Sequence, residues 1–263
     1  MKLSLVLLTA AVAIAVGMLT VAHQPVFAAD SATPVLVELF TSEGCSSCPP
    51  ADRFLETLDS QPIPGANVIV LSEHVDYWNH IGWKDPYSSH LYSERQSKYA
   101  QRFQLDGPYT PQMVVDGASQ FLGSNPALAD KAFATALESP KIPVRLSSLS
   151  VDASHILHAH VETGPLEPSF RLRSVDVYVA VALNHAETQV SGGENGGRTL
   201  THVAVTRSLT KVGELKQAQA LEQDFQVKLD PKWDSANLRL VAFLQESNQG
   251  RVVGAASLPL SAK

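Results

Sequence analysis

The hydrophobic pattern of the chain changes about half-way along its 263 residues. In the first half, short apolar runs alternate with segments whose apolar residues recur at helical spacing. In the second half, apolar and polar residues alternate one by one. The first pattern is typical of buried strands separated by helices, and the second of strands with one buried face. The change falls at residues 139–143, which include two prolines. We therefore predict an α/β domain over residues 33–138 and an all-β domain over residues 142–263.

Strands and helices alternate in the α/β half. Apolar runs predict strands at 35–40, 67–71 and 113–115, and helical spacing predicts helices at 51–58, 85–105 and 125–137. Asp116-Gly117 directly follows the third strand. This dipeptide favours the left-handed backbone of a two-residue hairpin loop, so a fourth strand is expected to fold back on the third.

The all-β half is expected to hold about seven short strands, a number typical of a β-sandwich. The alternation is clearest at 157–161, 175–183, 201–205 and 238–244. Turn sequences rich in glycine, proline or asparagine separate these segments. We therefore expect this half to be sandwich-like.

Two stretches of the all-β half contain residues of functional types. His158 and His160 lie on one strand face and suit a metal ion, but a solvated strand face is our interpretation. Glu194-Asn195-Gly196-Gly197-Arg198 is rich in glycine, yet it has neither the phosphate-loop nor the dinucleotide-binding pattern. We interpret it as a hairpin loop, with docking on the first domain near the cysteines as the alternative.

The strongest chemical signal is the pair Cys45 and Cys48, which are the two cysteines of the chain. They follow the first strand through a short turn, and Pro49 and Pro50, which come next, are tolerated in a first helical turn. Cys45 is therefore expected at or just before a helix start, where free N–H groups and the helix dipole favour the thiolate. Cys48 is then placed to resolve a mixed disulfide.

Redox chemistry is the interpretation that the Cys-Ser-Ser-Cys spacing favours, with metal ligation and an inert disulfide as alternatives. Soft thiolate ligands suit copper(I) or zinc, and His74 is a candidate third ligand. A disulfide that closes so small a loop contributes only about 2 kcal/mol in the chain-entropy model, so it is a weak staple.

Three stretches of the first half resemble a known family. They are F-T-S-E-G-C-S-S-C-P-P-A-D at Phe40–Asp52, H-V-D-Y-W at His74–Trp78 and Y-T-P-Q-M-V-V-D-G at Tyr109–Gly117. They resemble an uncharacterised family of secreted thioredoxin-like proteins, domain-of-unknown-function family 1223. A weaker likeness continues through Glu194–His202. The resemblance implies a thioredoxin-like fold and redox chemistry, and it supplies no substrate.

The resemblance also implies a substrate edge beside the cysteines. In thioredoxin-like proteins the loop before the antiparallel strand pair carries a cis proline, and Pro111 matches that position. A cis bond there leaves Thr110 with a free backbone edge that can pair with an extended substrate chain.

Further candidates for lining the site come at the end of the second predicted strand. His74, Asp76 and Trp78 follow that strand, whose carboxyl end is expected at the same sheet edge as the cysteines. A histidine near a thiolate can carry protons or stabilise charge. An ordinary hydrogen-bonded polar loop is the alternative for each of these residues.

The first 28 residues predict a signal peptide. Lys2 is followed by an apolar stretch over 3–22, and Val26-Phe27-Ala28 offers small residues for cleavage. The stretch is long enough to cross a bilayer, so an uncleaved anchor is the alternative. Export implies an oxidising compartment, in which one internal disulfide is possible. The formal net charge is −6, which argues against a nucleic-acid partner.

The sequence therefore predicts an exported protein with a thioredoxin-like α/β domain followed by an all-β sandwich-like domain. The expected activity is thiol–disulfide exchange with exported protein thiols or a redox partner protein, without a cofactor. Cys45 attacks, Cys48 resolves, and Thr110 and Pro111 position the substrate chain. The alternatives are a metal-binding module that uses the same cysteines and a thioredoxin-like binding protein without catalysis.

Overall fold

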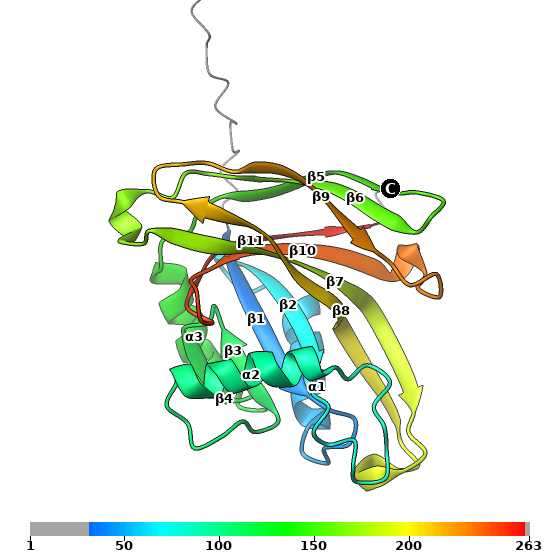
Figure 1. Cartoon of the computed structure of the whole chain (residues 1–263). Helices are drawn as coiled ribbons and strands as arrows, with labels where there is room; N and C mark the ends of the chain where they lie inside the picture. Colours follow the sequence, from blue (N-terminus) through cyan, green and yellow to red (C-terminus); the bar gives the residue numbers. More distant parts are fainter. Residues whose placement is uncertain (1–31, 261–263) are drawn as a thin grey trace, which may run out of the picture.

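A computed structural model describes residues 32–260, which form a large mixed sheet, a smaller sheet and three helices (Figure 1). The strands of the eight-stranded sheet lie in the order β11-β10-β7-β8-β2-β1-β3-β4, and those of the three-stranded sheet in the order β5-β6-β9. The first half contains β1 (Thr33–Thr41), α1 (Pro49–Ser60), β2 (Ala66–His74), α2 (His90–Arg102), β3 (Gln112–Val115), β4 (Ser119–Leu122) and α3 (Pro126–Glu138). The second half contains β5 (Val144–Val151), β6 (Ile156–Thr163), β7 (Ser174–Gln189), β8 (Thr199–Lys216), β9 (Glu222–Lys228), β10 (Leu238–Gln245) and β11 (Val252–Pro259).

β1 lies at the centre of the first half. It pairs in parallel with β2 along its whole length and antiparallel with β3, which pairs antiparallel with β4. Because side chains alternate along a strand, Val35, Val37 and Leu39 face α1 and α3 on one side of the sheet. Phe40 points to the other side, where it packs against Tyr99 of α2. The predicted hairpin at Asp116-Gly117 is confirmed, with positive φ at both residues, but its loop has three residues instead of two because Val115 pairs with Ser119.

The second half continues the sheet of the first. β8 meets β2 in parallel at Val205 and Ser72, and the long hairpin of β7 and β8 carries β10 and β11 at its far side. The three-stranded sheet packs over β7 and β10 through a second apolar core. Two sheets therefore face each other as in a sandwich, but one of the two extends into the α/β half.

Several predicted boundaries shift in the structure. The second strand runs on to His74, so this residue ends a strand instead of lying in a loop. Helix α2 begins at His90 and not at residue 85, because Ser89 caps it by accepting a hydrogen bond from the Leu91 amide. Residues 75–89 form an irregular loop, in which Asp85 bonds to Glu43, His74 and Tyr87 instead of starting the helix.

The predicted signal peptide, Met1–Ala28, lies outside the described residues.

None of the helices within residues 32–260 is long and apolar enough to span a membrane.

A buried ion pair holds α2 against both halves of the sheet. Arg95 of α2 donates from Nε to Glu38 Oε1 of β1 at 2.6 Å and from Nη2 to Gln245 Oε1 of β10 at 2.9 Å. Tyr99 donates its hydroxyl to the other oxygen of Glu38 at 2.5 Å. Burial and the neighbouring Glu38 raise the pKa of Glu73 well above its usual range, so one carboxylate is left to pair with Arg95.

Replacing Arg95 by methionine should therefore destabilise the protein by about 3–5 kcal/mol, because the buried charge of Glu38 loses its partner. The measurement is urea unfolding of the purified mature protein. Arg145→Met is the matched control, since Arg145 pairs with Glu162 on the surface and its loss should cost far less. Equal effects of the two substitutions would contradict a structural role for the Arg95 pair.

Candidate functional site

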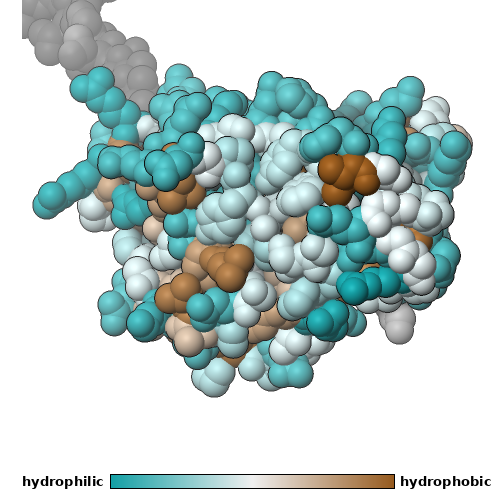
Figure 2. Space-filling model, turned by 90° about the horizontal axis from the view of Figure 1, so that it is seen from below, coloured by the Kyte–Doolittle hydropathy of each residue, from teal (hydrophilic) through white to brown (hydrophobic). Residues whose placement is uncertain are grey.

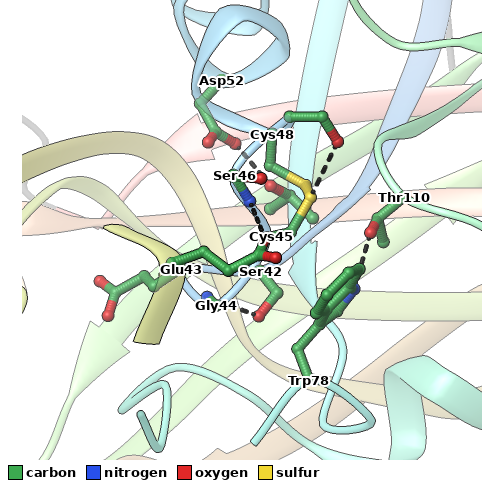
Figure 3. The surroundings of a disulfide bond; sticks show 12 residues. Ser42, Glu43, Gly44, Cys45, Ser46, Cys48, Asp52, Trp78 and Thr110 are labelled. Carbon is green, nitrogen blue, oxygen red and sulfur yellow. Dashed lines mark hydrogen bonds between the residues drawn. A yellow bond between two sulfur atoms is a disulfide. The ribbon is translucent and has the colours of Figure 1, made fainter. Parts of the chain in front are cut away.

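Cys45 and Cys48 form a disulfide at the start of α1 (Figure 3). A tight turn leads into it, in which the Cys45 amide donates to the Ser42 carbonyl and the Cys48 amide to the Cys45 carbonyl. Cys48 is the N-cap residue of α1 and directly precedes its first turn. Both cysteines are 0% exposed. No group from outside the protein could therefore contact the sulfurs unless a covering group moved.

Trp78 and Thr110 lie together beside the disulfide, as Figure 3 shows. The Trp78 indole N–H donates to Thr110 Oγ1 at 2.8 Å. Gly44 permits the close approach of Trp78, because a Cβ atom at Gly44 would lie 3.0 Å from the Trp78 Cβ. The Thr110–Pro111 peptide bond is cis, so this expectation is confirmed. Trp78, Thr110 and the cysteine pair are thus brought together from three separate loops.

His74 and Asp76 contribute to the loop that precedes α2. His74 is fully buried, and its Nδ1 lies 2.8 Å from Asp85 Oδ2. Asp76 accepts the Ser93 hydroxyl at 2.5 Å, while its own amide donates to the same hydroxyl oxygen at 3.0 Å. Burial would raise the pKa of Asp85, but His74 and two backbone amides lower it to about 2. These bonds fix the loop, and neither His74 nor Asp76 is seen to bond to the cysteine turn.

Glu43, two residues before Cys45, is a fully buried carboxylate that the sequence analysis did not select as a site residue. Its Oε2 accepts the Trp83 indole N–H at 2.8 Å, and its backbone amide donates to Asp85 at 2.9 Å. His202 Nε2, from β8, lies 3.4 Å from the other oxygen of Glu43. Residues of both halves of the chain therefore hold the turn that precedes the disulfide.

His202 lies between two buried carboxylates. Its Nδ1 is 3.9 Å from Asp52 Oδ1, which also accepts the Thr41 hydroxyl at 2.8 Å. Neither contact of the imidazole with Glu43 or Asp52 has hydrogen-bond geometry, so the attraction is between charges. Burial lowers the pKa of His202, but the contacts with Asp52 and Glu43 outweigh it and raise the pKa to about 10. His202 is therefore an imidazolium at neutral pH.

The glycine-rich loop at the tip of the β7–β8 hairpin docks on the cysteine turn. The tip includes one helical turn, η2 (Gly193–Asn195). The Asn195 side chain donates to the carbonyls of Glu43 and Cys45 at 2.9 and 3.0 Å, and Glu194 Oε2 accepts the Ser46 amide at 2.9 Å. The hairpin prediction and the docking alternative are both confirmed. The glycine-rich composition of the loop and the weak likeness over Glu194–His202 were the sequence signals for these residues.

His158 and His160 lie on a partly exposed strand face, where they contact Asp152 and Asp224 at 2.9 and 2.7 Å. Within residues 32–260, no three side chains of histidine, cysteine, aspartate or glutamate are grouped so as to hold a metal ion.

Comparison with known proteins gives a family without an assigned activity. Residues 36–245 match the model of a family described as protein of unknown function (DUF1223). The chain belongs to this family. No curated protein matches it.

Two solved structures are similar to the family member described above. Protein AGR_C_4864 from Agrobacterium tumefaciens is 25% identical with a TM-score of 0.69, and the match covers 90% of this chain and 98% of that one. HBP35 of Porphyromonas gingivalis is 15% identical with a TM-score of 0.62, and the match covers 87% of this chain and 75% of that one. The second likeness shows a shared fold alone.

The charge on His202 should make stability depend on pH in a defined direction. Because folding raises its pKa from 6.5 to about 10, the stabilisation is complete below pH 6.5 and is lost as the pH rises through about 10. We expect the difference in unfolding free energy between the wild type and His202→Gln to shrink across that range. Urea unfolding at a series of pH values measures this difference, and a difference that stays constant would refute the buried imidazolium.

Proposed function

We propose that this family member is an exported thiol–disulfide oxidoreductase that acts on protein thiols through Cys45 and Cys48. The observation that carries the proposal is the disulfide between two cysteines at the start of a helix, beside the Thr110–Pro111 loop. Helix starts favour thiolates through their free N–H groups and dipole.

The order of elements in the first half supports a thioredoxin-like fold as part of the proposal. A strand, a helix and a parallel strand come first, and a helix, a hairpin and a final helix follow. The sheet order β2-β1-β3-β4, with α1 and α3 on one face and α2 on the other, is the arrangement expected of such a domain. In this arrangement the cysteine turn stands at the carboxyl end of the central strand β1, where α/β sheets bind ligands.

The proposed chemistry transfers two electrons from a dithiol to a disulfide. A substrate thiolate attacks the Cys45 sulfur, the Cys45–Cys48 bond breaks, and Cys48 leaves as a thiolate that takes up a proton. A second substrate thiolate then attacks the substrate sulfur of this mixed disulfide and releases Cys45. The substrate dithiol, having lost two protons, is oxidised to a disulfide while the Cys45–Cys48 disulfide is reduced to two thiols. The same steps in reverse reduce a substrate disulfide.

Cys45 is the sulfur that exchanges with the substrate in this proposal. The Ser47 hydroxyl lies 3.4 Å from Cys45 Sγ, and a hydroxyl that donates to a thiolate stabilises it. Cys48 lies at the N-cap, directly before the buried Pro49, and is placed to resolve. Because both sulfurs are fully buried, a group that covers them must move when a substrate binds, and Trp78 and Thr110, which lie beside the disulfide, are the candidates.

The proposed substrate is an extended protein segment that pairs with the backbone edge at Thr110. Figure 2 views the end of the molecule that carries the cysteine turn and shows mostly hydrophilic or neutral residues with separate hydrophobic patches. Main-chain pairing gives affinity without a large apolar surface, so this face suits such a segment.

A second candidate is a binding protein in which the disulfide has no catalytic part. The complete burial of both sulfurs favours it, because an inert disulfide needs no access. The two candidates differ in whether mixed disulfides form.

Cys48→Ser should trap disulfide-linked complexes with exported proteins, because Cys45 attacks and nothing resolves the product. Cys45→Ser should trap far fewer, since the remaining thiol, Cys48, lies directly before the buried Pro49 and lacks the hydroxyl contact that Ser47 makes with Cys45. The measurement is non-reducing electrophoresis of cells quenched with acid and alkylated, followed by mass mapping of the complexes. The double substitution is the control. Complexes that form with Cys45→Ser instead would reverse the roles, and none with either variant would favour the binding protein.

Export is part of the proposal, and it rests on the pattern of Met1–Ala28. The native protein should begin near Ala29. Mass mapping of its N-terminal peptide measures this directly, and recovery of Met1 from the fully processed protein would count against a cleaved signal peptide.

A further inference from the structure

The hairpin of β7 and β8 crosses from the second half of the chain to the cysteine turn. Its strands pair from Ser174 and Lys216 as far as Gln189 and Thr199. In Figure 1 its tip, in yellow, lies next to the blue loop that follows β1. The tip touches the turn at three backbone positions, the carbonyls of Glu43 and Cys45 and the amide of Ser46. A segment about 150 residues away in the sequence therefore holds the residues that surround Cys45.

Asn195 is oriented for this contact. Its side chain is fully buried, and its Oδ1 accepts from Arg198 Nη1 at 3.0 Å. This bond directs Nδ2 to the two carbonyls of the cysteine turn. The opposite orientation would place the amide oxygen against two carbonyl oxygens and the NH₂ group against the guanidinium, so the arrangement selects one orientation.

Glycines let the tip approach the loop before α2 closely. A Cβ atom at Gly192 would lie 2.4 Å from the Gly82 carbonyl oxygen, and one at Gly193 would lie 3.0 Å from the Trp83 Cβ. Gly193 also has a φ of +67°, which favours glycine. The tip is therefore packed against the loop that holds Trp83, which in turn bonds to Glu43.

Glu194 places a negative charge at Ser46, the first of the two residues between the cysteines. Its carboxylate accepts the Ser46 amide at 2.9 Å and is exposed to solvent. Hydrogen bonds from the Ser46 side chain and amide lower the pKa of Glu194, so it is ionised at neutral pH. A carboxylate near a thiolate opposes its formation.

We propose that the hairpin tip is part of the exchange site. Asn195 positions the Cys45 turn and favours the Cys45 thiolate, and Glu194 opposes the formation of that thiolate. This inference rests on the proposed function and adds the second half of the chain to the site. The N–H groups of Asn195 neutralise the negative ends of the Glu43 and Cys45 carbonyls, which otherwise oppose a negative charge on Cys45. The neighbouring residues Asn195 and Glu194 therefore act with opposite sign on the same sulfur.

The test measures the Cys45 thiol in the Cys48→Ser background, in which one thiol remains. Thiolate absorbance is followed against pH, and the rate of reaction with oxidised glutathione is measured at neutral pH. The variants are Asn195→Ala and Glu194→Gln. Asn237→Ala is the control for the first, because Asn237 also makes two side-chain bonds to backbone, at His185 and away from the cysteines. Glu187→Gln, an exposed acid on the same hairpin, is the control for the second.

We expect Asn195→Ala to lower the thiolate fraction at neutral pH, and with it the rate, about fivefold, as the loss of net hydrogen bonding predicts. Glu194→Gln should raise the thiolate fraction about twofold, and high salt should reduce this effect. The controls should leave both quantities unchanged. Shifts of the same sign in the two variants, or shifts no larger than those of the controls, would overturn the proposal.

Two further outcomes keep the test decisive. If Asn195→Ala does not fold, Arg198→Ala replaces it, because removal of the guanidinium frees the Asn195 amide to turn. High salt screens the effect of the lost Arg198 charge, so the part of the change that persists in high salt reports the reorientation of the Asn195 amide. If the thiol titration gives the expected opposite shifts but the wild type exchanges with no protein dithiol, the proposed function fails and the role of the tip in setting the thiolate stands. Opposite shifts together with exchange support both.

Discussion

The strands of the two halves meet at one ladder position in the described chain, between Ser72 of β2 and Val205 of β8. An apolar cluster that includes Leu71 of β2 and Phe243 of β10 packs across this joint, and buried polar side chains cross it as well. Arg95 links Glu38 of β1 to Gln245 of β10 across one face of the sheet. On the other side of the joint, His202 of β8 lies between Glu43 and Asp52. Removing one partner of such a pair leaves a buried charge unpaired, which is strongly destabilising, so each half depends on the other.

The cysteine turn lies at this joint and has partners in both halves. Glu43 comes two residues before Cys45 and is held by its side chain, its amide and its carbonyl at once. Asp52 follows Cys48 by one helical turn, and its amide donates to the Cys48 carbonyl. The disulfide is therefore flanked on both sides by residues that have partners in the second half, Asn195 and His202, and Glu43 has partners in the first half as well. This explains how a small α/β unit and a strand-rich segment form one site.

The sequence predicted those parts of the fold that local pattern determines. The apolar run at 35–40, the cysteines before two prolines and the Asp116-Gly117 turn each identify an element from a few neighbouring residues. The extension of the eight-stranded sheet across both halves was not predicted, because strand pairing between distant segments leaves no local signal. Asn195 and His202 were missed as site residues for the same reason. An asparagine in a glycine-rich loop reads as a turn residue until its partner carbonyls are known, and a histidine on an alternating strand gives no sign of two carboxylates beneath it.

The central claim is that the Cys45–Cys48 pair changes its oxidation state while the protein stays folded. The most direct measurement is the reduction potential of the pair, obtained by equilibrating the mature protein with defined mixtures of reduced and oxidised dithiothreitol and counting free thiols. Circular dichroism is recorded on the same samples. The account predicts a potential above about −300 mV with an unchanged fold in the reduced form, because structural disulfides of secreted proteins lie below that value. A potential below about −300 mV, or unfolding on reduction, would identify the disulfide as structural and contradict the account.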